Sequence, residues 1–140
     1  MKKTIAFILC VLTLMSVLQL PLFAKSAEGV VPFSDSTVDA TAILYIDANG
    51  KASATVKYTG YSSVTTGGTI TTKLQKRFLG VFWKTVDDQV WVDSSSSYHY
   101  SVTHTYQLSD TGTYRIVANF QIAGVGGTVD EIERTAQDAW

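Results

Sequence analysis

The sequence predicts an all-β protein, an antiparallel sandwich of about seven strands in two sheets. Ser and Thr supply 28 of the 116 residues from Lys25 onward, beside many Val, Ile and Tyr residues. These β-branched and aromatic side chains suit a pleated surface. Pro32 is the only proline in that part of the chain, and no long stretch of it has apolar residues at helical spacing. Several segments instead alternate with a period of two, as half-buried strands do.

The first 24 residues have the composition of an export signal. Two lysines precede an apolar stretch from Thr4 to Leu18, and Pro21 and Ala24 then supply the helix-breaking and small residues that a signal peptidase site requires. We expect cleavage after Ala24 and secretion into the medium. Cleavage after Ala27 would leave a lysine three positions before the cut, and an uncleaved membrane anchor is the competing interpretation.

The signal prediction fixes several properties of the mature chain. Cys10 lies inside the apolar stretch, so we expect an exported domain without disulfides. Nine basic residues against twelve acidic ones give no excess of positive charge for phosphates, so no nucleic-acid partner is expected. Because cleavage would remove the apolar stretch, no integral membrane association is expected after it. The expected organisation is a signal peptide at 1–24, a flexible segment at 25–39, a β-sandwich domain at 40–136 and a tail at 137–140.

The first two strands are expected to form a hairpin. A strand over Ala40–Asp47 is followed by Asn49-Gly50, a pair that suits a two-residue type I′ turn. A polar loop is expected over 60–68. The return strand before it alternates, with one face formed by Ala52, Ala54, Val56 and Tyr58.

The remaining strands are predicted by the same alternation. The expected ranges are Thr69–Phe78, Trp83–Asp93, Tyr98–Leu108, Tyr114–Ile122 and Thr128–Thr135, with a turn at Leu79–Phe82. The residues expected to point inward include Ile70, Leu74, Tyr114, Ile116, Ala118, Phe120 and Ile122.

A short motif, LSDTGTYRI at Leu108–Ile116, refines the fold class. It matches the D-x-G-x-Y corner of immunoglobulin-like sandwiches, in which the Tyr114 hydroxyl would reach a nearby backbone group. Ile116 occupies the position of the antibody disulfide cysteine, so a cysteine-free sandwich fits better. The expected class is therefore an immunoglobulin/fibronectin-type-like antiparallel β-sandwich.

The order of four segments also resembles a known group of proteins. These segments are Gly60-Tyr61, LQKRFLGVFW at Leu74–Trp83, GTYRI at Gly112–Ile116 and a final strand that contains Glu. Over most of residues 40–135 the chain resembles small secreted proteins of Gram-positive, chiefly clostridial, bacteria that are classed as a domain of unknown function. The resemblance implies export, a β-sandwich and a Gram-positive source, and it supplies no catalytic residues.

The residues that could perform chemistry form no recognised catalytic or metal-binding pattern. His99 and His104 are separated by an odd number of residues, so on one strand they would point to opposite faces and could not share a metal. One acidic cluster lies at Asp87-Asp88 and Asp93, and a second at Asp130–Glu133. Either could serve a small hydrolase or calcium, although charges in strands usually mark a solvated face. We expect no cofactor, no metal and no enzymatic activity.

The segment KLQKRFLGVFWK, Lys73–Lys84, is the most suggestive for binding. As a helix it would be basic and amphipathic, and as a hairpin it would place an apolar tip between cations. The alternation before it favours the hairpin. Such a tip could be a recognition site or could plug the end of the sandwich. The candidate binding residues are Leu79, Val81, Phe82 and Trp83. Trp91 is added because an aromatic ring on an outer face could stack on sugars, and packing of Trp91 in the core is the competing interpretation.

These features predict a secreted, non-enzymatic binding module for an envelope glycan, a host surface or another protein. A bacteriocin-like antagonist that acts on membranes through the basic hairpin is one alternative, and a small secreted hydrolase is another. Trp140, the last residue, either fixes the C-terminal tail or moves freely.

Overall fold

The computed structural model describes residues 35–140, and the predictions for the signal peptide at 1–24 and most of the 25–39 segment lie outside them. The described residues contain no helix, and so none that is long and apolar enough to cross a membrane. Seven strands account for most of them: β1 (Thr37–Ile46), β2 (Lys51–Gly60), β3 (Thr65–Phe78), β4 (Phe82–Ser95), β5 (His99–Gln107), β6 (Thr113–Gly124) and β7 (Val129–Ala139).

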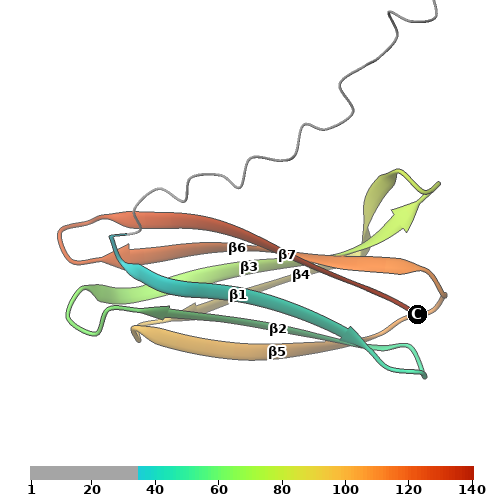
Figure 1. Ribbon diagram of the computed structural model, residues 1–140, viewed down its shortest axis with the longest axis horizontal. Helices are drawn as coiled ribbons and strands as arrows, with labels where there is room; N and C mark the ends of the chain where they lie inside the picture. Colours follow the sequence, from blue (N-terminus) through green and yellow to red (C-terminus); the bar gives the residue numbers. More distant parts are fainter. Residues whose placement is uncertain (1–34) are drawn as a thin grey trace, which may run out of the picture. The chain divides into compact units, whose positions relative to one another are not determined.

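The strands form two antiparallel sheets (Figure 1). One has the order β1-β2-β5 and the other the order β4-β3-β6-β7. Their inner faces pack around one core. The predicted all-β, two-sheet antiparallel sandwich of about seven strands is confirmed.

The core consists of the residues that the alternation assigns to the inner faces. Burying one Val, Leu, Ile or Phe side chain stabilises a fold by about 1.5–3 kcal/mol. Because residues 35–140 contain no cysteine, this packing holds the sheets together without a disulfide. The fully buried hydrophobic members are Val56, Ile70, Leu74, Ile116, Ala118, Phe120 and Ile122, and the rings of Tyr58 and Tyr114 are almost fully buried.

Side chains of β7 block the free edge of β1. The carboxylate of Asp138 accepts a hydrogen bond from the backbone N–H of Ile46 at 2.7 Å, and Arg134 Nε donates to the carbonyl of Ala40 at 3.0 Å. Asp130 accepts two further bonds at the start of β1. The unpaired N–H and C=O groups of an edge strand can pair with a strand of another chain and so start aggregation. Charged side chains that bond to these groups are one way to prevent such pairing.

The first hairpin corrects the predicted turn. β1 ends at Ile46 and β2 begins at Lys51, and the N–H of Asp47 donates to the carbonyl of Lys51. These two residues thus close a loop of three, Ala48–Gly50, in which only Gly50 has a positive φ, of 77°. The carboxylate of Asp47 accepts hydrogen bonds from the N–H groups of Asn49 and Lys51. The two-residue type I′ prediction is wrong because this aspartate stabilises a longer loop that closes on a left-handed glycine.

Five strands are longer than expected: β4 and β6 by one residue at the start and two at the end, and β1, β3 and β7 by three or four residues at one end. β3 begins at Thr65, so the loop before it covers only 61–64, because pairing with β6 continues past two glycines that interrupt the apolar pattern. β1 begins at Thr37. β7 runs to Ala139, so the segment predicted as a tail is mostly strand that pairs with β6.

The expected tyrosine corner is present. The Tyr114 hydroxyl donates to the backbone carbonyl of Asp110 at 2.5 Å.

Trp140, which directly follows β7, is held by backbone and side-chain contacts. Gly112, near the tyrosine corner, exchanges two backbone hydrogen bonds with Trp140, each 3.0 Å long. The indole of Trp140 lies against Gly50, where an added Cβ would meet the ring at 2.6 Å, and donates to the carbonyl of Ala48. Trp140 therefore fixes the C-terminus.

Candidate functional site

The distal part of the β3–β4 hairpin, residues 75–85, turns away from the sandwich because β4 carries a large bulge (Figure 1). Lys73 pairs with Val90 and Gln75 pairs with Thr85, so four residues of β4 lie opposite one residue of β3. Two of the four, Asp87 and Asp88, have positive φ angles of 41° and 55°. Bulges bend a strand and strengthen its twist, and here the bend produces a protruding hairpin arm.

The tip of this arm is a tight turn with an unusual residue. Leu79 and Gly80 have φ angles of 50° and 71°, and the N–H of Val81 donates to the carbonyl of Phe78. Two successive positive φ values suit Asn-Gly, whereas a leucine is sterically strained in that region. An added Cβ at Gly80 would meet no atom within 4 Å, so the turn lies clear of the rest of the domain.

The large apolar side chains of the arm are exposed to solvent. Leu79 is 74% exposed, Val81 70% and Phe82 64%, and Phe78 beside them is 57% exposed. The segment 73–84 is thus a hairpin whose tip does not plug the end of the sandwich. We call these four residues the apolar tip.

Trp83 belongs to the base of the arm. The guanidinium carbon of Arg115, on β6, lies 4.3 Å from the centroid of the Trp83 ring, and that of Arg77 lies 5.9 Å from it. Arg115 also donates from Nε to the side-chain oxygen of Gln75 at 2.8 Å. The two contacts of Arg115 fasten the arm to β6, whereas the contact of Arg77 with Trp83 lies within the arm. Both arginines leave positive charge behind the apolar tip.

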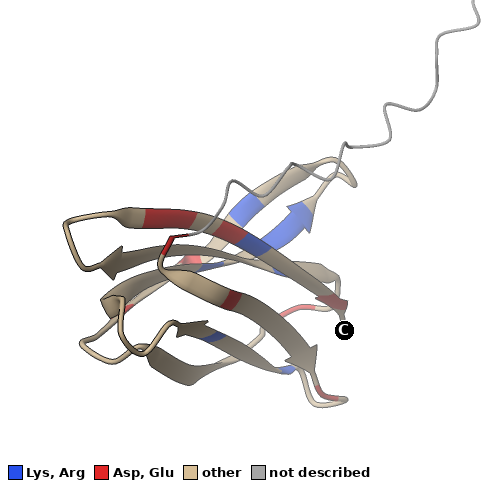
Figure 2. Ribbon diagram, turned by 60° about the vertical axis from the view of Figure 1, so that its left-hand side comes forward, with Lys and Arg blue, Asp and Glu red and all other residues tan. Residues whose placement is uncertain are grey.

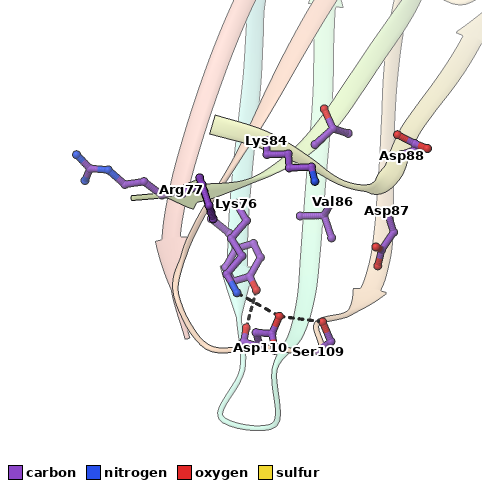
Figure 3. Close-up of a pocket in the computed structure, with 11 residues that line it drawn as sticks. Lys76, Arg77, Lys84, Val86, Asp87, Asp88, Ser109 and Asp110 are labelled. Carbon is purple, nitrogen blue, oxygen red and sulfur yellow. Dashed lines mark hydrogen bonds and ion pairs between the residues drawn. The ribbon is translucent and has the colours of Figure 1, made fainter. Parts of the chain in front are cut away.

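A cavity of about 560 Å³ lies between the arm and the β5–β6 loop (Figure 3). Lys76 bridges it through an ion pair of 3.3 Å with Asp110. Although partial desolvation acts against it, the hydrogen bond with Asp110 raises the pKa of Lys76. Lys84 extends into the same hollow, while Arg77 points away from it. The lining residues are Lys76, Arg77, Phe78, Lys84, Thr85, Val86, Asp87, Asp88, Ser109, Asp110 and Tyr114.

Trp91 faces inward rather than outward. Its ring is half-buried against the core and stacks on His104 with a centroid separation of 4.9 Å and an interplanar angle of 1°. His104 Nε2 shares a hydrogen bond of 2.7 Å with the carboxylate of Asp93. Of the two interpretations of Trp91, the structure therefore supports packing against the core and not an outer face offered to sugars. The ring of His104 is held between Trp91 and Asp93 and has a structural role.

The acidic clusters take part in structural contacts. Asp87 accepts a hydrogen bond of 2.5 Å from the hydroxyl of Tyr106, which raises the pKa of that tyrosine. Asp130 binds the start of β1, and Glu131 accepts from Gln121. Within residues 35–140 no three His, Cys, Asp or Glu side chains gather where they could hold a metal ion.

The structure brings Leu79, Val81 and Phe82 together with Phe78 at one tip, places Trp83 at its base and separates Trp91 from them. Sequence reasoning missed the contributions of Arg115 and of the bulge. Arg115 is distant in sequence, although the two adjacent aspartates at 87–88 interrupt the alternation of their strand and are a signal of irregularity.

No protein-family model, curated protein or solved structure matches this chain. The resemblance to secreted Gram-positive proteins therefore stays a prediction.

Proposed function

We propose that this protein is a secreted, non-enzymatic binding module that engages a cell surface through the apolar tip of the β3–β4 arm. The target would be an envelope glycan, a host surface or a surface protein. The exposure of four large apolar side chains on one protruding turn carries this proposal. Contiguous exposed apolar groups commonly mark interaction sites, and aromatic anchors such as Phe78 and Phe82 dominate binding energies.

The rest of the molecule supports the same function. The β1-β2-β5 and β4-β3-β6-β7 sheets, together with the tyrosine corner, favour an immunoglobulin/fibronectin-type-like sandwich. In such a domain a rigid framework presents loops that bind. The export signal predicted at 1–24 and the resemblance to Gram-positive secreted proteins favour an extracellular site of action.

Co-sedimentation with intact bacterial envelopes tests the proposal. We expect the wild-type protein to pellet and a Val81→Ser, Phe82→Ser double variant to remain in solution. The control is a Val90→Ser, Val92→Ser variant, which changes two exposed valines of the same strand outside the arm and should pellet like the wild type. Equal pelleting of all three proteins, or of none, would refute recognition of envelopes by the tip.

A further inference from the structure

We propose that the target of the apolar tip is an anionic lipid bilayer, which the protein binds peripherally. In this inference, which rests on the proposed function, the tip enters the headgroup region while the cations of the arm remain at the level of the lipid phosphates. Binding of this kind depends on buried apolar area together with attraction to anionic lipids.

The distribution of charge favours an anionic surface. The arm, residues 75–85, contains three cations, Lys76, Arg77 and Lys84, and no acidic residue. The other described residues contain five basic and eleven acidic side chains. In Figure 2 the blue bands of the arm lie on the protruding hairpin. Asp87, Asp88 and Asp110 lie at its base, where they line the hollow together with Lys76 and Lys84. An anionic surface would therefore attract the arm and repel the body, which sets the orientation of binding.

The free charge of the arm comes chiefly from two of these cations. Lys76 is paired with Asp110, whereas among the described residues Lys84 Nζ has no hydrogen-bond or ion-pair partner. Arg77 is exposed, and within residues 35–140 its guanidinium makes only the distant contact with the Trp83 ring. Each Lys or Arg near an anionic bilayer strengthens binding, by an amount that falls with increasing salt.

The strain at Leu79 is an independent observation in favour of an apolar target. Asn or Gly would adopt a φ of 50° with less strain, and an exposed leucine makes no compensating contact with the core. A strained residue at a protruding tip points to a function of its side chain. The Trp83 ring behind it has the amphipathic character that aromatic residues show at membrane interfaces.

Vesicle co-sedimentation tests this inference, with vesicles of phosphatidylcholine alone and vesicles in which part of it is replaced by phosphatidylglycerol. We expect binding to the anionic vesicles, weakened by salt. Leu79→Asn should reduce the partition coefficient at least about tenfold, and Lys84→Gln about fivefold. Val125→Asn, at the opposite end of the sheet, and Lys57→Gln, on β2, are the matched controls and should bind normally.

Leu79→Asn also separates binding from folding. Because asparagine tolerates the left-handed region, this variant should melt at or above the temperature of the wild type while it binds less. Equal binding to both kinds of vesicle, or normal binding by Leu79→Asn, would overturn the inference. If envelopes pellet the protein in a tip-dependent manner but anionic vesicles do not, the lipid target is refuted and the proposed function stands. If neither pellets it, both fail.

Discussion

Thr72→Val should stabilise the protein, because it removes a buried hydroxyl that has no partner. Thr72 lies on the central strand β3, between the fully buried Ile70 and Leu74, and is itself fully buried. Among the described residues its Oγ1 is the buried side-chain oxygen or nitrogen atom without a hydrogen bond. A hydroxyl in this state costs about 1–3 kcal/mol, and valine has nearly the same shape.

We expect the free energy of unfolding to rise by about 1–3 kcal/mol. Urea denaturation would show a higher midpoint at an unchanged slope, and melting would occur about 4–8 °C higher for each kcal/mol in a domain of this size. Thr59→Val, at an exposed position of β2, is the control and should change stability by less than about 0.5 kcal/mol. An unchanged or lowered midpoint for Thr72→Val would refute the reasoning and indicate that a buried water satisfies the hydroxyl.

Three further predictions concern particular hydrogen bonds. Tyr114→Phe removes the bond of the tyrosine corner and should lower the free energy of unfolding by about 1–2 kcal/mol in urea denaturation, and no loss would show that the corner does not stabilise the fold. Asp138→Ala should speed hydrogen exchange of the Ile46 amide, measured by NMR, and unaltered protection there would contradict the role of β7 in blocking the edge. The hydrogen bond to Asp87 raises the pKa of Tyr106 in the folded protein. The contribution of this bond to the free energy of unfolding is therefore present below the ordinary tyrosine pKa and is lost as the pH rises through the raised pKa of the folded state. Stability should therefore fall at alkaline pH above about 10, less steeply in Tyr106→Phe, and equal slopes for the two proteins would refute this coupling.

The arm shows how local and distant information combine. The alternation up to Phe78 and the apolar residues after it predict a hairpin with an apolar tip, and both features are present. Whether that tip would plug the sandwich could not be predicted, because the answer depends on the bulge at Asp87-Asp88 and on the contact between Arg115 and Trp83. These features arise from strand register and from a residue on another strand, which local periodicity does not encode.

The tertiary structure also decided the environment of single residues. The strand phase of Trp91 is compatible with either face of β4, and its stacking on His104 of the opposite sheet places it inside. Trp140 could be assigned only once the first hairpin and the C-terminus were seen together. In both cases the partner lies on a segment that is distant in sequence.

By itself the sequence determined the all-β class, most strands and their inward faces, because side-chain alternation is a local property that follows directly from strand geometry. It also determined the tyrosine corner, whose residues lie within one short motif. The three-residue first loop, the blocked edge of β1 and the protrusion of the arm were decided only by the tertiary structure. Each depends on where separate strands meet, and that arrangement is set by packing over the whole chain.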